Sequence, residues 1–247
     1  MTACPKLAHS TQRETQMELT RRSFMAGAAG ASALALGAAT VGAAPADAAP
    51  RPDGVIVTPA IALRRLREGN ARWASGRSAR KTYAPPGQSP EAGQWPFAAL
   101  VSCADSRVVP EDLFDVAGKN LFILRNAGNV VDDVTLGSLE YAVEHTGIAL
   151  IVVLGHGHCG AVMATESSLA TGTMPGGYVN SIVDLIAPGI EALPPGHTID
   201  EAIAANARHS AERIQNLSSV IAERTAAGTV GIVTAVYGLR KRTATFF

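Results

Sequence analysis

The chain has 247 residues, of which 47% are hydrophobic, and its 21 Lys and Arg balance its 21 Asp and Glu. A chain of this length and apolar content can bury a substantial core, so a wholly disordered protein is excluded and one large or two small domains are expected. Because the charge is balanced and only 5% of the residues are aromatic, no basic, stacking surface is expected, and we predict no nucleic-acid partner.

The amino-terminal residues have the organisation of an export signal. Arg21 and Arg22 end a basic segment, residues 23–46 form an apolar stretch rich in Ala and Gly, and residues 46–48, Ala-Asp-Ala, provide a small-x-small cleavage site. This stretch contains too little Leu, Ile and Phe to predict a stable membrane anchor. A buried Ala-rich helix is the alternative interpretation.

Residues 20–25, Thr-Arg-Arg-Ser-Phe-Met, resemble the twin-arginine signal, which is associated with proteins exported in the folded state. Met25 and Ala26 depart from the Leu-Lys pair that usually ends this signal. We therefore predict that residues 1–48 are an export signal peptide. Residues 49–247 would then form one mature domain in the periplasm or outside the cell.

From Phe97 onwards, short apolar runs alternate with helical stretches, which indicates an α/β fold with a central, mostly parallel β-sheet flanked by helices. The expected strands span residues 97–102, 120–124, 148–154 and 229–236, with a further edge strand at 243–247. The expected helices span residues 133–146, 159–170, 179–187 and 198–226, the last opened by a Thr-Ile-Asp-Glu capping box.

An amphipathic helix is also expected ahead of the sheet, at residues 60–75. Thr58 can cap this helix, and Pro59 suits its first turn. Ala62, Leu66 and Trp73 form a single apolar stripe along it. The predicted sheet offers no obvious seat for this stripe.

Two of the expected strands run into clusters of polar side chains. Cys103, Asp105 and Arg107 follow one strand, and His156 and Cys159 follow another. The carboxyl ends of parallel strands lie at the same edge of a sheet, where ligands bind between the loops. We therefore expect two thiols and an imidazole to meet there.

Thiolate and imidazole donors suit a zinc ion, and the two-residue gap between His156 and Cys159 is that of a chelating turn. Cys103 would supply the third donor from the neighbouring strand. Three protein ligands leave one tetrahedral position for water, which is the arrangement of a catalytic zinc site rather than a structural one.

Several short motifs stand in the order found in the β-class carbonic anhydrases, which the chain resembles over roughly residues 61–162. They are Cys-Ala-Asp-Ser-Arg-Val at 103–108, Arg-Asn-Ala-Gly-Asn at 125–129, Ser-Leu-Glu-Tyr-Ala at 138–142, and Gly155-His156 followed by Cys159-Gly160-Ala161. The resemblance implies zinc held by Cys103, His156 and Cys159, with Asp105 and Arg107 as a catalytic pair. It also implies a lyase, carbonate dehydratase, that reversibly hydrates carbon dioxide to bicarbonate and a proton.

The chemistry of Asp105 and Arg107 supports these implied roles. An ionised Asp105 can only accept hydrogen bonds, so a hydroxide on the zinc would have to donate to it and aim a lone pair at carbon dioxide. Arg107 can grip this carboxylate in a bidentate pair and keep it ionised. In the family, the equivalent aspartate can instead occupy the fourth zinc position and shut the site. Both states of Asp105, as fourth metal ligand or as partner of Arg107, stay open here.

Three alternatives compete with this hypothesis. In an oxidising compartment, Cys103 and Cys159 could form a disulfide instead of holding a metal, although His156 and Asp105 would then be unexplained. Hydrolases of carbon disulfide or carbonyl sulfide resemble the family closely and differ in the shape of their substrate tunnel. A non-catalytic zinc-binding module would leave Asp105 and Arg107 without a role. His158, between two expected ligands, is interpreted as a surface residue rather than a proton shuttle.

The resemblance also implies an assembly. In the family, an amino-terminal helix lies across a neighbouring subunit and the dimer is the basic unit. We therefore predict a homodimer or a tetramer in which the stripe formed by Ala62, Leu66 and Trp73 is buried between chains.

Overall fold

The structure, a computed structural model, describes residues 54, 56–79, 91 and 93–247. The expected export signal lies outside these described residues. Within them, no helix has both the length and the apolar character needed to cross a membrane.

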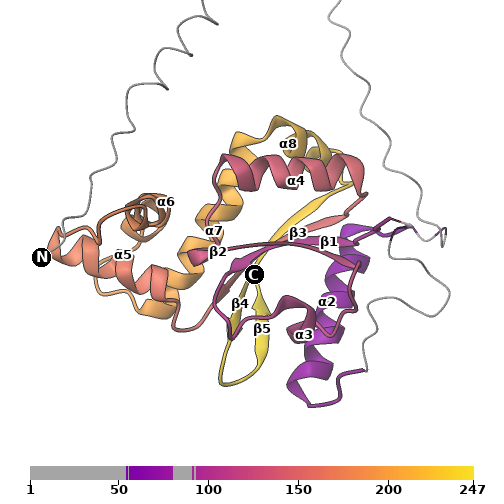
Figure 1. Cartoon of the computed structure of the whole chain (residues 1–247), viewed down its shortest axis with the longest axis horizontal. Helices are drawn as coiled ribbons and strands as arrows, with labels where there is room; N and C mark the ends of the chain where they lie inside the picture. The colour runs from indigo at the N-terminus through magenta and orange to yellow at the C-terminus, as the bar shows by residue number, and fades with distance from the viewer. Residues whose placement is uncertain (1–53, 55, 80–90, 92) are drawn as a thin grey trace, which may run out of the picture. The chain divides into compact units, whose positions relative to one another are not determined.

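In the described part of the chain, five strands form one sheet in the order β2-β1-β3-β4-β5 (Figure 1). Strands β1 to β4 run parallel, and β5 joins the edge in the antiparallel direction. The strands are β1 (Ala98–Cys103), β2 (Leu121–Asn126), β3 (Leu150–His156), β4 (Gly231–Gly238) and β5 (Thr243–Phe246). The expected α/β fold with a mostly parallel central sheet is confirmed.

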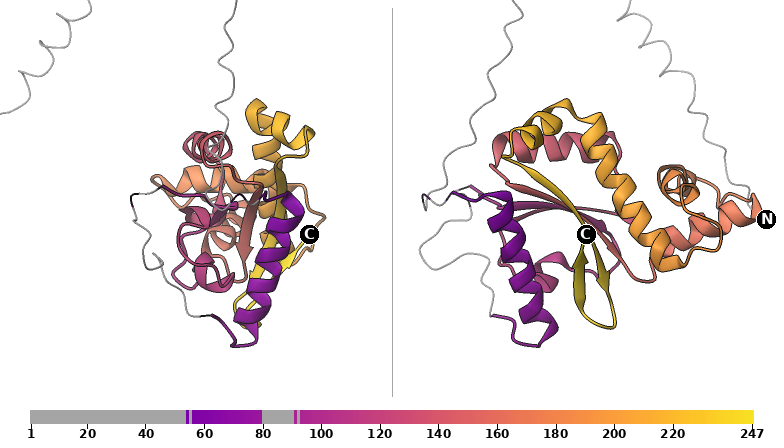
Figure 2. Two further views of the ribbon diagram at one scale, coloured as in Figure 1. Left: turned by 90° about the vertical axis from the view of Figure 1, so that its right-hand side faces the viewer. Right: turned by 180° about the vertical axis from the view of Figure 1, so that it is seen from behind.

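Helices cover both faces of this sheet. Figure 1 shows α4 and α8 on one side of the strands and α2 and α3 on the other. The helices are α2 (Pro59–Ala74), α3 (Pro110–Leu113), α4 (Asp133–His145), α5 (Gly160–Thr171), α6 (Val179–Glu191), α7 (Ile199–Leu217) and α8 (Ser219–Ala226), with a 3-10 turn, η2, at Ala127–Asn129. In Figure 2, α5 and α6 lie beyond the end of the sheet, next to α7.

The alternation of side chains along the central strands divides the core into two layers. On β1, Ala98 and Leu100 pack with residues of α2 and α3, whereas Ala99 and Val101 pack with residues of α4, α7 and α8. All six residues of β1 and all seven of β3 are buried. These strands are therefore continuous apolar runs, as expected for parallel strands that are covered on both faces.

Helix α2 packs against its own chain. The expectation that a partner subunit buries its apolar stripe is therefore wrong for Ala62 and Leu66. Ala62 and Leu66 are fully buried in the core that includes Leu113 and Phe114. Gly69 makes this close approach possible, because a Cβ atom there would overlap the carbonyl oxygen of Phe114. The short helix α3, which forms part of this contact surface, is not among the helices predicted from the sequence.

Side-chain hydrogen bonds fix α2 further. The Asn70 amide donates to the carbonyl oxygens of Leu113 and Arg242, at 2.9 and 3.2 Å, and its Oδ1 accepts from the Ala244 N–H at 2.8 Å. Trp73 Nε1 donates to the Tyr237 hydroxyl at 3.1 Å. Helix α2 is thus tied to α3 and to the β4–β5 hairpin.

The expected helix at residues 198–226 is two helices. It breaks at Ser218, whose backbone is extended and whose hydroxyl accepts from the Ile221 N–H at 3.1 Å and so caps α8. Helix α6 continues past its expected end at residue 187 and contains Pro188. There it packs closely on α7, since a Cβ atom on Gly189 would lie 2.8 Å from the Cβ atom of His209.

Candidate active site

The three expected metal ligands converge at the carboxyl edge of the sheet. Cys103 is the last residue of β1 and His156 the last of β3, and these two strands are hydrogen-bonded neighbours. Cys159 is the residue that precedes α5 as its N-cap. One donor atom from each of the three lies within 4.8 Å of the other two, and all three side chains are buried. The expectation that two thiols and an imidazole meet in space is therefore met.

The state of His156 suits metal binding. Its Nδ1 lies 3.0 Å from the carbonyl oxygen of Gly157, which can only accept, so Nδ1 carries the proton. Its Nε2 is buried and has no hydrogen-bond partner among the described residues. A buried ring nitrogen that has no hydrogen-bond partner and lies beside two sulfur atoms can bind a cation, and the carbonyl oxygen at the other nitrogen orients the ring.

The thiols of Cys103 and Cys159 interact with each other. The Cys103 pKa is held well below its usual range, chiefly because the Cys159 thiol donates to its sulfur, with smaller contributions from His156 and the Gly128 N–H. The pKa of Cys159 is raised, chiefly by the same interaction with Cys103. Both cysteines are free in the described chain. A divalent cation among them would favour two thiolates, and this soft donor set with one imidazole fits zinc.

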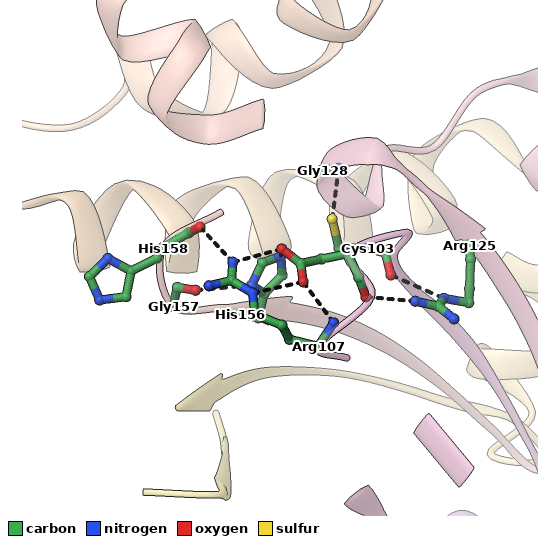
Figure 3. Close-up of polar contacts among 8 residues, drawn as sticks. Cys103, Arg107, Arg125, Gly128, His156, Gly157 and His158 are labelled. Carbon is green, nitrogen blue, oxygen red and sulfur yellow. Dashed lines mark hydrogen bonds and ion pairs between the residues drawn. The ribbon is translucent and has the colours of Figure 1, made fainter. Parts of the chain in front are cut away.

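Arg107, which lies beside His156 in Figure 3, forms an ion pair with Asp105. Asp105 Oδ2 lies 4.0 Å from Nε2 of His156, so its carboxylate stands beside the ligand cluster. The bonds from Arg107 hold the pKa of Asp105 well below its usual range, and Asp105 in turn raises the pKa of Arg107. An ionised carboxylate that only accepts hydrogen bonds therefore faces the metal donors.

The comparisons with known proteins agree with this geometry. The carbonic anhydrase family profile matches residues 98–243. Carbonic anhydrase 2 of Mycobacterium tuberculosis is 40% identical over 190 residues, which cover 73% of this chain and 89% of that protein. The carbonic anhydrase of Mycolicibacterium smegmatis is 39% identical over 189 residues, with the same two coverages.

Among solved structures, the Coccomyxa β-carbonic anhydrase in complex with acetazolamide superposes with a TM-score of 0.58 and 26% identity, covering 74% of this chain and 85% of that one. The chain belongs to the β-class carbonic anhydrase family. A tetrameric β-carbonic anhydrase from Sordaria macrospora shares the fold at a TM-score of 0.54 and 19% identity, covering 75% of this chain and 96% of that one.

In this β-class carbonic anhydrase, Arg125 on β2 supports the site in a way that sequence reasoning missed. Its Nε donates to the carbonyl oxygen of Cys103 at 3.2 Å, and its Nη2 donates to that of Asp105 at 2.7 Å (Figure 3). Arg125 thus holds the backbone on which a ligand and the carboxylate stand. Its position in the Arg-Asn-Ala-Gly-Asn motif was a signal, but its contacts depend on β2 lying beside β1.

His158 lies beside the site without entering it. Its backbone has a positive φ of 56°, and its carbonyl oxygen accepts from Arg107 Nη2 at 3.5 Å. The side chain is exposed, and its ring points away from His156 (Figure 3). This placement agrees with the prediction of a surface residue.

A cavity of about 190 Å³ is found at the other edge of the sheet. It is lined by residues just before β3 and β4, among them Ile148, Ala149 and Val230. Because Cys103 and His156 end their strands at the carboxyl edge, this cavity is separate from the ligand cluster.

Proposed function

We propose that this protein catalyses the reversible hydration of carbon dioxide to bicarbonate and a proton, with a zinc ion held by Cys103, His156 and Cys159. The observation that carries the proposal is the carboxylate of Asp105, which Arg107 holds with Oδ2 at 4.0 Å from Nε2 of His156. Three protein ligands with an open fourth position and an ionised acceptor beside it fit a catalytic zinc site rather than a closed, four-ligand structural one. The relatives of similar length are named carbonic anhydrases.

Zinc, when bound, supplies a Lewis-acidic position at which water ionises near neutral pH. Two thiolates neutralise the charge of the ion, so the ionisation is less favourable than beside three imidazoles, and activity should rise from neutral to alkaline pH.

Asp105 orients the nucleophile. Its Oδ2 carries no proton, so the attacking oxygen must point its own hydrogen at Oδ2 and is left with a lone pair for the carbon of carbon dioxide. Arg107 prevents Asp105 from taking up a proton or turning. We propose that Asp105 acts in this way while paired with Arg107, and that it becomes a fourth metal ligand, shutting the site, when the pair is broken.

Stopped-flow carbon dioxide hydration by zinc-loaded protein tests the proposal. Asp105→Asn replaces an acceptor with a group that also donates, and we expect kcat/KM to fall by about 10²-fold, the size of effect that follows when a reacting group is misoriented. Asp133→Asn, in the exposed first turn of α4, is the matched control and should keep full activity. Undiminished turnover of Asp105→Asn would remove Asp105 from the mechanism.

We propose that the protein assembles as a homodimer or a tetramer. Support comes from large apolar side chains that the chain leaves exposed on α4 and around α5 and α6, such as Val134, Met163 and Tyr178. The central residues of α2 are buried within the chain and are no longer part of the expected interface. Sedimentation equilibrium at micromolar concentration tests the assembly, and a monomer there would contradict it.

We propose that residues 1–48 direct export through the twin-arginine route. Support comes from Arg21-Arg22, the following apolar stretch and the small-x-small site at residues 46–48. Replacing Arg21 and Arg22 together with Lys should leave the protein in the cytoplasm, because the route depends on both guanidinium groups. Fractionation of cells that express each form, with the amino terminus of the exported form sequenced, gives the readout. Export of the Lys form at the original level would exclude this route.

A further inference from the structure

The loop at residues 126–130, between β2 and α4, has an unusual backbone. Gly128 and Asn129 both have positive φ, at 77° and 46°, which costs free energy for any residue other than Gly. The side chain of Asn126 closes the ends of this loop. Its Nδ2 donates to the carbonyl oxygen of Val130 at 2.8 Å, and its Oδ1 accepts from the Val130 N–H at 2.9 Å. These bonds fix the two ends of the loop and leave its apex to other contacts.

The apex of the loop lies against a ligand of the proposed metal. The N–H of Gly128 donates to Sγ of Cys103 at 3.4 Å (Figure 3). The apex also has no room for a side chain, because a Cβ atom on Gly128 would lie 2.7 Å from Cδ1 of Ile186 and 3.0 Å from Cβ of Ala161. The position of this N–H therefore depends on the contacts that the Gly128 backbone makes through its carbonyl oxygen.

Asn206 on α7 holds the apex. Its Nδ2 donates to the carbonyl oxygen of Gly128 at 2.8 Å, and the side chain is fully buried. Since a carbonyl oxygen only accepts, the nitrogen of the amide must face it. The amide oxygen, Oδ1, has no partner among the described residues. Burying a half-satisfied amide costs stability that an apolar residue of the same size would not, so the bond to Gly128 is the contact that accounts for the amide.

Helix α7 is also seated against the strand that carries the histidine ligand. A Cβ atom on Gly155, the residue before His156, would lie 3.2 Å from Cγ2 of Ile203. Ile203 is one turn ahead of Asn206 on the same helix. Helix α7 thus contacts β3 next to His156 and also contacts the 126–130 loop, which lies against Cys103. It therefore helps to set the position of His156 relative to Cys103.

We propose that Asn206 is a positioning residue for the metal centre: by holding the Gly128 carbonyl it directs the Gly128 N–H at the Cys103 sulfur. This inference rests on the proposed function, in which Cys103 is a metal ligand. A hydrogen bond to a thiolate draws electron density from the sulfur and fixes its position. Outer-shell partners of this kind typically contribute 10- to 100-fold to metal affinity or activity.

Asn206→Leu tests the inference, because it keeps the volume of the side chain and removes the donor. Ser210→Ala is the matched control, since Ser210 is buried one turn further along α7 and makes no hydrogen bond to the 126–130 loop in the described structure. We expect Asn206→Leu to weaken zinc binding by about tenfold in competition with a chelator. In the cobalt-substituted protein, the thiolate-to-cobalt charge-transfer band should move to longer wavelength, because the sulfur is richer in electrons.

Nuclear magnetic resonance of the zinc-loaded protein gives a direct readout. The Gly128 amide proton should move upfield in Asn206→Leu and stay in place in Ser210→Ala. If Asn206→Leu does not fold, Asn206→Ala removes the same donor without adding bulk and is measured in its place. An unchanged charge-transfer band and an unchanged Gly128 proton in a folded variant would overturn the inference. A wild-type protein without a thiolate band on cobalt would instead overturn the proposed metal site itself.

Discussion

Arg107 donates to both carboxylate oxygens of Asp105, from Nε to Oδ1 at 2.9 Å and from Nη2 to Oδ2 at 2.7 Å. The backbone N–H of Arg107 adds a third bond to Oδ1, also at 2.9 Å. Two parallel bonds from a planar guanidinium fix both the rotation and the ionisation of the carboxylate. The direction in which Asp105 presents its free lone pairs is therefore set by Arg107.

Replacing Arg107 should release Asp105. We expect Arg107→Ala to lower kcat/KM by roughly 10- to 100-fold, as for other outer-shell partners. Arg107→Lys should recover only part of the loss, because a point charge cannot hold two oxygens in one plane. In the cobalt-substituted protein, the visible spectrum of Arg107→Ala should show an added oxygen ligand as Asp105 moves onto the metal. A spectrum identical to wild type, with lowered activity, would contradict this movement.

Removing the metal should destabilise the protein and expose a reactive thiol. For a ligand at about 1,000 times its Kd, the loss is about 4 kcal/mol, or roughly 10 °C in Tm for a domain of this size. In the metal-free protein, Cys103 has a pKa well below neutral, so its alkylation rate should be nearly constant between about pH 6 and 8. An ordinary thiol, with a pKa of about 8.5, reacts about tenfold faster for each pH unit in that range.

Cys159→Ser tests whether the thiol of Cys159 causes the lowered pKa of Cys103. The thiol of Cys159 is the largest cause of the lowered pKa of Cys103, and a hydroxyl is a different donor at this place, so the pH dependence of alkylation should change. Mass spectrometry of the modified peptide identifies the cysteine that reacts. Preferential labelling of Cys159 in the wild-type protein would show that Cys159, and not Cys103, is the thiol with the lowered pKa.

The ion pair between Glu166 on α5 and His197, just before α7, should make the stability of the fold depend on pH. His197 Nδ1 lies 2.9 Å from the Pro194 carbonyl oxygen, and Nε2 lies 2.7 Å from Glu166 Oε1. Both ring nitrogens face acceptors, so the imidazolium form is favoured and the pKa of His197 is raised, first by Pro194 and then by Glu166. A raised pKa stabilises the fold fully below the unfolded value of about 6.5, and this contribution is lost as the pH rises through the folded value.

Thermal unfolding of His197→Gln measures this effect. The difference in Tm from wild type should be largest near pH 6 and should shrink towards about pH 9, well above the ordinary histidine pKa. His145→Gln, which removes a ring that stacks on Tyr141, is the control for the loss of an imidazole elsewhere in the chain. A constant difference for His197→Gln would mean that the ring acts only through packing.

Gly69→Ala should test the seat of α2. Its Cβ atom would overlap a backbone oxygen of Phe114, which cannot turn aside as a side chain can, so we expect at least about 3 kcal/mol of destabilisation, the upper end for overpacking. Gly137→Ala, in α4 with open space at the Cβ position, should instead be neutral or stabilising by up to about 1 kcal/mol. Equal Tm values for the two variants would contradict the close approach of α2.

The ligand set could be predicted from the sequence because its donors stand at, or shortly after, the ends of strands that are apolar along most of their length. Cys103 and His156 prove to be the last residues of their strands rather than the first residues of loops, which places them more rigidly than expected. The prediction needed only that β1 and β3 be parallel and close, and the alternation of apolar runs and helices provides that.

The parts that could not be predicted depend on contacts between distant segments. Asn206 is an ordinary polar residue in a long helix until α7 is packed under the 126–130 loop. From the sequence, Gly69 only lowers the helix propensity of α2. Its role becomes clear when the carbonyl oxygen of Phe114, just after α3, is found where a Cβ atom would lie. At Ser218 the chain leaves one helix and caps the next. The helix propensities of the residues around it are too similar to predict from the sequence whether the helix continues or breaks there.

The ligands of the metal centre come from strands that adjoin in the sheet, although β2 and α4 lie between them in the chain. During synthesis, Cys103 emerges well before His156 and Cys159, so a growing chain cannot complete the donor set until β3 has been made and paired with β1. The complete donor set therefore requires the native strand order, because a chain with β2 inserted between β1 and β3 would hold Cys103 apart from His156 and Cys159.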